Sequence, residues 1–406
     1  MAVLGGCRRD TAGGNHRRLG AGFRRVLGVA ALKPDSTDRP FFATAAKGTE
    51  GALRDELREL RIPRVRADRG GVHFGGELEH GMRVCLRSRI ALRVLWRVAT
   101  FTAVDSDTLY EGTATVDWSR FLDSQRTLAV SATVKHGALR HTGFVAQRIK
   151  DAVVDQLRAR GRARPDVDRH DPDVHVVAHI THDEAWLFVD LAGAPLSRRG
   201  YRAEGGEAPL REHLAAAMLR LGGWRPGAPF VDPMCGSGTL PIEAALWAEA
   251  RAPGGRRHFG FERWRCFDDA AVAAWAVEGE RAAAFAAPVE TRIEGSDRDP
   301  RALVLSRANA RRAGVAIRFG RRDFGAIRPL AAGTFVVTNP PYGVRVEQDE
   351  HWIPELRRAL DVLRDATVVV ITPDRGLPDA AGRAADREHT LFNGNLECRL
   401  FTWAPR

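Results

Sequence analysis

Lysine is rare in this chain of 406 residues: only four of its 62 basic residues are lysine, and the others are arginine. No apolar run approaches eighteen residues, which excludes a membrane-spanning helix. The five cysteines include no Cys-x-x-Cys pair, which argues against a zinc site and a disulfide framework and fits a reducing cytoplasm; they are Cys7, Cys85, Cys235, Cys266 and Cys398.

The charge that is present lies mostly in the first half of the chain. The formal net charge is +11, of which residues 1–200 carry +9 and residues 201–406 carry +2. An anionic partner is therefore expected to bind the first half. The strong preference for arginine is also typical of a GC-rich genome, so charge alone does not identify that partner as nucleic acid.

A glycine-rich loop stands in the second half. The motif Asp232-Pro233-Met234-Cys235-Gly236-Ser237-Gly238-Thr239 follows a strand predicted over residues 228–231 and precedes a helix predicted over residues 240–247. This order places backbone N–H groups at a helix N-terminus, and the glycines allow a positive φ or a close approach of a ligand. The loop has no lysine after its glycines, so a nucleotide triphosphate is disfavoured. An ordinary strand-to-helix turn is the alternative.

Two acidic positions follow at later strand ends. A strand predicted over residues 289–293 leads to Asp297, where a carboxylate can accept both hydroxyls of a ribose. Asp299 is expected instead to cap the helix predicted over residues 302–313. A third strand, over residues 316–320, leads to Asp323, whose expected contact is an adenine amine and whose alternative is a surface turn.

The motif Asn339-Pro340-Pro341-Tyr342 ends a buried strand predicted over residues 334–338. Two consecutive prolines exclude helix and hold the backbone carbonyls in place. An amine on an aromatic ring is a poor nucleophile, but the Asn339 side-chain oxygen and the Pro340 carbonyl could hold its two N–H groups. Tyr342 offers a face for base stacking, typically worth about 1–3 kcal/mol. Positioning, not a strong base, would then supply the rate.

These motifs resemble those of the class I S-adenosylmethionine (SAM)-dependent methyltransferases. The resemblance implies that the acceptor is held by Asn339, Pro340, Pro341 and Tyr342. It implies that SAM is held by Asp232, Pro233, Cys235, Gly236, Ser237, Gly238, Thr239, Asp297 and Asp323. Cys235 is expected to pack in the loop and not to act as a nucleophile, and no metal is required.

The first half predicts two α+β units. Strands are expected over residues 40–45, 65–74 and 92–101, with helices over 48–60 and 78–90. In the second unit, strands over residues 128–134, 174–180 and 185–191 accompany a helix over 144–160. RNA contacts are expected from basic residues on and after that helix, namely Lys150, Arg158, Arg160, Arg162 and Arg164. A solvated helix end is the alternative.

From Phe41 onward the layout resembles the THUMP-domain RNA methyltransferases, in particular the bacterial large-subunit (23S) rRNA guanine-N2 methyltransferase family. The resemblance rests on Ala46-Lys47-Gly48-Thr49-Glu50, Asp190-Leu191-Ala192-Gly193, Leu196-Ser197-Arg198-Arg199-Gly200-Tyr201-Arg202, Ala208-Pro209-Leu210-Arg211-Glu212-His213-Leu214-Ala215-Ala216 and Leu391-Phe392-Asn393-Gly394-Asn395-Leu396-Glu397-Cys398. On physical grounds alone, Asn393-Gly394 is a hairpin turn.

The fold class implied is α/β: a Rossmann-like, seven-stranded methyltransferase domain preceded by ferredoxin-like and THUMP domains. The expected boundaries are a disordered basic extension at 1–39, a ferredoxin-like segment at 40–104, a THUMP domain at 105–195 and a methyltransferase domain at 196–406. An insertion at about 250–285 carries Phe259, Phe261 and Trp264, which are expected to pack and not to stack on bases.

The implied activity is methyl transfer to guanine N2 in 23S rRNA by a cytoplasmic monomer that binds RNA and no membrane. Some members of the family carry a second methyltransferase domain after the first, whereas this sequence ends at Arg406, so only the guanine-N2 activity is expected to carry over. A tRNA guanine-N2 enzyme with the same domain order is the closest alternative. A DNA adenine-N6 enzyme, a glutamine methyltransferase and a non-catalytic RNA-binding protein are less favoured.

Overall fold

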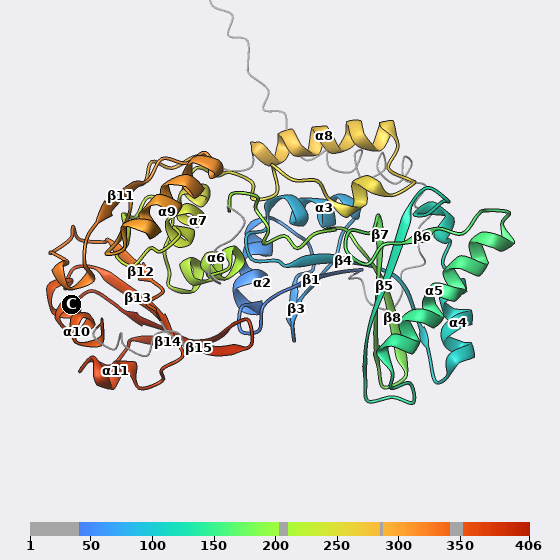
Figure 1. The fold of residues 1–406 in the computed structure, drawn as a ribbon, viewed down its shortest axis with the longest axis horizontal. Helices are drawn as coiled ribbons and strands as arrows, with labels where there is room; N and C mark the ends of the chain where they lie inside the picture. Colours follow the sequence, from blue (N-terminus) through green and yellow to red (C-terminus); the bar gives the residue numbers. More distant parts are fainter. Residues whose placement is uncertain (1–39, 203–209, 285–286, 342–351) are drawn as a thin grey trace, which may run out of the picture.

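The computed structural model describes residues 40–202, 210–284, 287–341 and 352–406. The basic extension predicted at 1–39 lies outside these ranges. Among the described residues, no helix is both long and apolar enough to cross a membrane. Figure 1 shows two α/β bodies side by side, with helix α8 lying along one edge of the molecule.

An eight-stranded sheet forms the first body, in the order β2-β3-β1-β4-β8-β7-β5-β6. Its elements are β1 (Phe41–Thr44), α2 (Glu50–Glu59), β2 (Arg66–Asp68), β3 (Gly71–Phe74), α3 (Leu78–Arg87), β4 (Arg93–Thr102), α4 (Ser106–Ala114), η1 (Trp118–Arg120), β5 (Thr127–Lys135), α5 (Thr142–Ala159), β6 (Asp166–Val167), β7 (Val174–Thr181) and β8 (Glu184–Asp190). The long strand β4 pairs with β1 on one side and with β8 on the other, so one sheet runs through both predicted α+β units.

The second body contains a seven-stranded sheet in the order β11-β10-β9-β12-β13-β15-β14. Its elements are α6 (Glu212–Leu221), β9 (Phe230–Asp232), α7 (Thr239–Ala248), η2 (Gly260–Arg263), α8 (Asp269–Ala283), β10 (Ile293–Asp297), α9 (Pro300–Ala313), β11 (Arg318–Arg321), η3 (Phe324–Ala326), β12 (Phe335–Thr338), α10 (Trp352–Val362), β13 (Thr367–Thr372), α11 (Leu377–Ala380), β14 (Arg387–Asn393) and β15 (Leu396–Trp403). Strands β11, β10, β9, β12 and β13 are parallel, and β15 is antiparallel to β13.

The strand order of the second sheet reverses beside β9. The chain runs from β9 outward to β10 and β11, then returns to the other side of β9 to form β12 and β13. Ligands of doubly wound sheets bind at such a switch point, outside the carboxyl ends of the strands. The loops after β9 and β12 carry the two motifs of the sequence, so the topology places both motifs at this point.

Most predicted elements are present, but three predictions needed correction. Residues 65–74 form the hairpin β2–β3 and not one strand, because Gly70 takes a φ of +80° and reverses the chain. The strand predicted at 289–293 begins only at Ile293, where parallel pairing with Phe230 starts. The strand predicted at 316–320 is likewise displaced and spans Arg318–Arg321. Helices α4, α6, α8, α10 and α11 and strands β6 and β13 were not predicted from the sequence.

The insertion packs against the first body. Phe259, Phe261 and Trp264 are 3%, 0% and 1% exposed and belong to the apolar core of that body. The Trp264 ring stacks on Trp96, with ring centroids 6.2 Å apart, and meets the edge of Phe121 at 5.1 Å. The prediction that these aromatic residues pack is confirmed. The ring partners of Trp264 belong to the first half of the chain, whereas Phe259 and Phe261 stack on each other.

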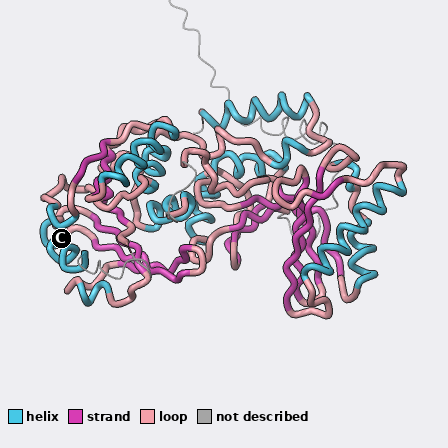
Figure 2. The backbone as a smooth tube through the Cα atoms, viewed as in Figure 1, coloured by secondary structure: helices cyan, strands magenta, loops and turns pink. Residues whose placement is uncertain are grey.

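Figure 2 shows strands in both bodies with helices beside them. Helix α7 begins directly after the glycine loop, and near its carboxyl end the Leu246 carbonyl accepts a hydrogen bond from Arg89 of the first body. Its carboxyl end is closed by hydrogen bonds from the Ala250 N–H to Trp247 and from the Arg251 N–H to Leu246, both 3.0 Å long. Ala250 adopts a left-handed φ of +53°, a conformation that usually favours glycine. The helix therefore ends on a residue whose Cβ opposes its backbone conformation.

We expect Ala250→Gly to raise the free energy of unfolding by about 1 kcal/mol, because it removes the left-handed penalty of a Cβ. Urea unfolding of the full chain measures the change. Ala244→Gly, a buried substitution in the middle of the same helix, is the matched control and should lower stability by at least about 0.5–1 kcal/mol. A loss of stability in Ala250→Gly would contradict the assignment of strain.

Candidate functional site

The glycine loop joins β9 to α7 and is tied to the next strand. The Cys235 N–H donates to the Ser296 carbonyl at 2.9 Å, and the Gly236 N–H donates to Asp297 Oδ2 at 2.8 Å. The other oxygen of Asp297 accepts the Asp299 N–H at 2.9 Å. The structure thus brings Asp297 to the loop, at the end of β10 as the sequence predicted.

The two glycines of the loop have different physical reasons to be glycine. Both have positive φ, +51° at Gly236 and +85° at Gly238. A Cβ added at Gly238 would lie 2.9 Å from Cβ of Ser306, so α9 packs directly against the start of α7. A Cβ added at Gly236 would meet nothing within 4 Å. The loop is therefore open at Gly236, which fits the approach of a ligand to its backbone.

Asp232 lies at the carboxyl end of β9 with 2% of its surface exposed. Its Oδ1 accepts the Met234 N–H at 3.1 Å and the Thr338 hydroxyl at 2.9 Å, which links β9 to the strand that carries the second motif. Burial raises the pKa of Asp232 to about 7, against the lowering effect of these two hydrogen bonds. A cationic group bound at this carboxylate would favour its ionised form.

The remaining loop residues are packed or bonded. Pro233, Cys235 and Thr239 are buried, and Ser237 is half-buried. Burial raises the pKa of the Cys235 thiol, so the thiol stays neutral and the predicted packing role fits. The Ser237 carbonyl accepts the Asn309 amide at 3.0 Å, and the Thr239 hydroxyl accepts Arg202 Nη2 at 3.1 Å. Asn309 and Arg202 brace the loop from α9 and from the boundary segment.

The second motif begins where β12 ends. Asn339 is half-buried, Pro340 is buried and Pro341 is exposed, whereas Tyr342 lies outside the described residues. The Asn339 side-chain oxygen is buried and accepts no hydrogen bond from any residue that the structure describes. A buried amide oxygen without a donor costs free energy, and such atoms occur where a ligand supplies the donor.

Asp323 is exposed and starts the short helix η3 after β11, where its Oδ1 accepts the Gly325 N–H at 2.9 Å. Asp299 caps α9 as predicted, since its Oδ1 accepts the Arg301 N–H at 2.8 Å. The glycine loop, Asp297, Asp323 and Asn339 all follow parallel strands at one edge of the sheet. Within the described ranges, no group of His, Cys, Asp and Glu side chains could hold a metal ion.

Sequence reasoning missed a buried ion pair on α7, the helix that follows the glycine loop. Glu243, in the middle of α7, is fully buried and accepts Arg199 Nε at 3.2 Å and the Tyr201 hydroxyl at 3.1 Å. Burial works to lower the pKa of Arg199, but the charge and hydrogen bond of Glu243 together with nearby Tyr201 and Glu212 outweigh it, and the pKa is raised. Arg199 and Tyr201 belong to the motif at residues 196–202, on which the family resemblance partly rests. No local sequence pattern identifies Glu243 as their partner.

Arg89 from the first body holds the carboxyl end of α7. Its Nη2 donates to the Leu246 carbonyl at 2.9 Å and to the Arg251 carbonyl at 2.6 Å, and its own carbonyl accepts Arg199 Nη2 at 2.5 Å. Glu56 accepts the Arg89 N–H at 2.9 Å. Burial lowers the pKa of Arg89 to about 10, so the guanidinium remains charged at neutral pH. Arg89 of the first body and Arg199 from the boundary segment therefore both hold α7 in place.

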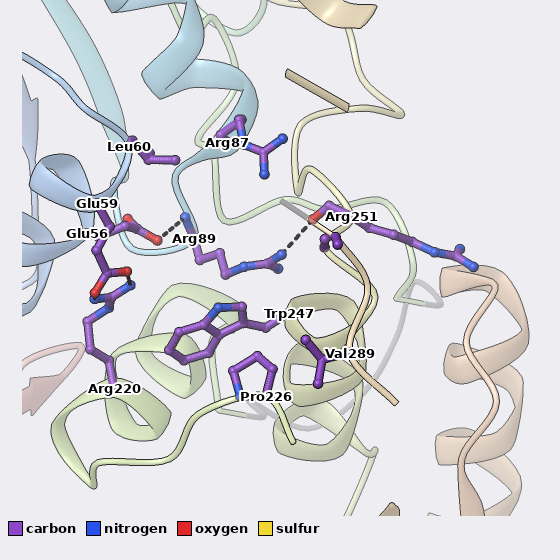
Figure 3. A pocket seen from close by; sticks show the side chains of 12 residues that line it. Glu56, Glu59, Leu60, Arg87, Arg89, Arg220, Pro226, Trp247, Arg251 and Val289 are labelled. Carbon is purple, nitrogen blue, oxygen red and sulfur yellow. Dashed lines mark hydrogen bonds and ion pairs between the residues drawn. The ribbon is translucent and has the colours of Figure 1, made fainter. Parts of the chain in front are cut away.

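Figure 3 shows the cleft at this boundary, with Arg89 between Glu56 and Trp247 and with Arg220 against Glu59. The cleft has a volume of about 240 Å³. None of the predicted site residues lines it. It lies at the opposite end of α7 from the glycine loop, about 15 Å away for a ten-residue helix.

The predicted RNA-binding residues lie on and beyond α5. Arg158, Arg160 and Arg164 are exposed, while Lys150 and Arg162 are half-buried. Arg160 makes a close ion pair with Asp117, Arg158 lies 3.7 Å from Asp155, and Lys150 lies 3.9 Å from Asp151. Three of the five cations therefore already have acidic neighbours, which reduces the free positive charge at this surface.

Three family models match successive parts of the chain. They are the RlmL ferredoxin-like domain at residues 40–95, the THUMP domain at 103–190 and the RMKL-like methyltransferase domain at 199–402. A curated relative from Methylococcus capsulatus, named ribosomal RNA large subunit methyltransferase K/L, is 42% identical over 375 residues. The alignment covers 89% of this chain and 51% of the relative, so the chain spans about half the length of that protein.

Two solved structures share the fold over nearly the whole chain. SMU.472, described as a methyltransferase and crystallised with SAH, has 29% identity and a TM-score of 0.81, and the match covers 90% of this chain and 98% of that one. A predicted N6-adenine-specific DNA methylase from Listeria monocytogenes also has 29% identity and a TM-score of 0.81, covering 91% and 96%. With a family match over residues 199–402 of 406, the chain belongs to the family of the RMKL-like methyltransferase domain.

Proposed function

We propose that this protein transfers a methyl group from SAM to the exocyclic N2 of a guanine in 23S rRNA, in the cytoplasm. The observation that carries the acceptor assignment is the buried Asn339 oxygen, which lacks a donor among the described residues. The name of the Methylococcus relative supports large-subunit rRNA as the substrate. The THUMP match and the basic first half support RNA as the partner.

We propose residues 40–104 as a ferredoxin-like segment, 105–195 as a THUMP domain and 196–406 as the methyltransferase domain. The family matches at 40–95, 103–190 and 199–402 support this division. We also propose that the protein acts as a monomer. The first two domains share one sheet, so they would move together as a single RNA-binding body.

The donor side is assigned to the loop after β9 and the two acidic strand ends. Asp232 would pair with the ammonium of the methionine moiety, Asp297 would accept the ribose hydroxyls and Asp323 would meet the adenine amine. The open space at Gly236 leaves room for the ligand against the backbone. Pro233, Cys235, Ser237, Gly238 and Thr239 would shape the same loop. When bound, SAM supplies an electrophilic methyl group on a sulfonium.

The acceptor side needs no strong base. Asn339 Oδ1 and the Pro340 carbonyl would accept the two N–H groups of the guanine amine and turn its lone pair toward the methyl group. Pro341 keeps the turn rigid, and Tyr342 would stack on the base. A paired, stacked N2 cannot reach this buried edge, so the base must be single-stranded or turned out of its stack.

Labelled SAM, offered in parallel to unmodified large-subunit rRNA, bulk tRNA, DNA and a release factor, tests the proposal through nucleoside analysis of the product. N2-methylguanosine in rRNA is the expected result. The same nucleoside in tRNA would move the substrate to the closest alternative. N6-methyladenine in DNA would favour the activity named for the Listeria protein, and label in the release factor would indicate a glutamine methyltransferase.

In the same assay, Asn339→Ala should lower kcat by about 100-fold or more and leave the affinity for SAH within twofold, because the variant loses an interaction with the acceptor only. Calorimetric titration with SAH measures the second quantity. Gln125→Ala removes an exposed amide from the first body and is the control expected to keep full turnover. Normal turnover in Asn339→Ala would overturn the acceptor assignment.

The affinity for SAM should depend on pH through Asp232. Above pH 7 the carboxylate is ionised and can pair with an ammonium, whereas below pH 7 it holds a proton that binding must displace. Affinity should therefore fall about tenfold from pH 8 to pH 6. Asp232→Asn should bind weakly with no such dependence, while Asp323→Asn should retain the dependence. A flat profile in the unchanged protein would contradict the ammonium contact.

Gly236→Ala and Gly238→Ala should separate binding from folding. Gly236→Ala should cost about 1 kcal/mol of stability for its left-handed φ, and should greatly weaken SAH binding because the methyl group takes ligand space. Gly238→Ala should cost about 2 kcal/mol or more, since its Cβ also meets Ser306. Urea unfolding and SAH titration measure the two effects. If the two variants lost equal amounts of unfolding free energy and of SAH affinity, the separate roles of Gly236 and Gly238 would be contradicted.

A further inference from the structure

The two bodies touch a second time, at the edge of the sheet that carries the candidate site. The loop after β1 meets the β14–β15 hairpin, and Figure 1 shows this hairpin reaching toward α2 of the first body. A Cβ added at Gly48 would lie 2.2 Å from the Thr390 carbonyl oxygen, so the backbones of the two segments are in direct contact. Gly48 meets this requirement with a φ of +89°.

The loop after β1 is held firmly by its own hydrogen bonds. The Thr49 hydroxyl donates to the Ala46 carbonyl at 2.7 Å. The two oxygens of Glu50 accept the Gly48 N–H at 2.7 Å and the Gly70 N–H at 3.1 Å. Glu50 is the nearest carboxylate in the sequence, and both of its oxygens accept backbone N–H groups. It therefore does not pair with the basic residue between Ala46 and Gly48.

That residue is Lys47, one of only four lysines in the chain. Its side chain is exposed, and its ammonium lies 4.1 Å from the centroid of the Phe392 ring on the hairpin. No carboxylate of the described residues pairs with it. A cation over an aromatic face is held in place by the ring but keeps its N–H groups available for an anion.

The hairpin tip lies on the same edge as Asn339. Thr338 pairs with Val370 in β13, and two residues later Thr372 pairs with Arg399 in β15. The residues that precede Arg399 therefore project beyond the carboxyl end of β13, and Phe392 is paired with one of them, Glu397. The strand order β12-β13-β15-β14 sets a lateral separation of three strand spacings, about 14 Å.

Other charges near the hairpin compensate one another. Arg375 lies 2.5 Å from Glu397, and Arg399 lies 2.9 Å from Glu397 and 3.1 Å from Glu388. These two arginines and two glutamates carry no net charge together. Lys47 therefore supplies a positive charge that these groups do not compensate at this contact between the bodies.

We propose that Lys47, seated on Phe392, binds a backbone phosphate of the RNA strand that carries the target guanine. The inference rests on the proposed function. An RNA strand that runs from the first body to Asn339 along this edge would pass the contact between loop and hairpin, with its phosphates within a few nucleotides of the target. Lys47 positions that strand from a loop that the backbone contact at Gly48 fixes relative to the sheet.

The test compares Lys47→Gln, Lys47→Arg and Arg318→Gln in the full chain. Arg318 is exposed at the amino end of β11, at the opposite edge of the sheet, so its variant removes the same charge from a surface that the RNA does not cross. Methyl transfer gives kcat and KM for rRNA, and equilibrium binding of the same RNA over a range of salt gives the number of phosphate contacts. SAH titration and thermal unfolding report on the donor site and the fold.

Lys47→Gln should raise KM for RNA about three- to tenfold with kcat within twofold. It should also reduce the slope of log affinity against log salt by about 0.7–0.9, the value of one phosphate contact. Lys47→Arg should keep most of the affinity, Arg318→Gln should match the unchanged protein, and SAH affinity and unfolding temperature should stay constant.

An unchanged KM and salt slope in Lys47→Gln would overturn the inference, as would an equal loss in Arg318→Gln, which would indicate an effect of net charge. If the unchanged protein methylates none of the RNA substrates, the proposed function fails instead. The binding arm still decides the role of Lys47 in that case, because RNA affinity and its salt dependence are measured without turnover.

Discussion

The arrangement of the whole molecule depends on the buried ion pair between Arg199 and Glu243. Glu243 stands in the middle of α7, whose first residues continue the glycine loop and whose last carbonyls accept Arg89 from the other body. Removing one partner of such a pair leaves an uncompensated buried charge, which typically costs about 3–5 kcal/mol. The pair therefore sets where α7 lies, and α7 sets where the glycine loop lies relative to the first body.

The proposed function depends on positioning, which requires more than one contact between the two bodies. The Arg89 contact lies at the carboxyl end of α7, behind the sheet, whereas the Gly48 contact lies at the edge where the strands end. A single contact would leave a hinge, but two contacts at opposite ends of the sheet limit rotation. The insertion adds a third through Trp264, whose ring packs on Trp96 of the first body. Together these contacts fix the first body relative to the edge of the second sheet that carries the candidate site.

The sequence predicted the parts of the site that follow from local patterns. Asp232, the glycine loop and Asn339 stand at the ends of apolar strands, and the structure gathers these ends at one edge. What the sequence could not provide were the contacts made across long separations. Glu243 looks like any acidic residue of a helix until Arg199, 44 positions earlier, is found beside it. The strand expected at 289–293 begins at Ile293 because pairing with β9, and not β propensity, determines where it starts.

The proposed donor and acceptor sites differ in their electrostatics. At the proposed donor site, burial makes ionisation of Asp232 costly, so a bound cation would stabilise the carboxylate. The proposed acceptor site offers neutral oxygens, which would orient an amine without competing for its proton. Net charge does not distinguish the two bodies, because residues 41–190 and residues 201–406 each carry a formal charge of +2. An anionic polymer would therefore be held by particular basic side chains and not by the overall charge of one body.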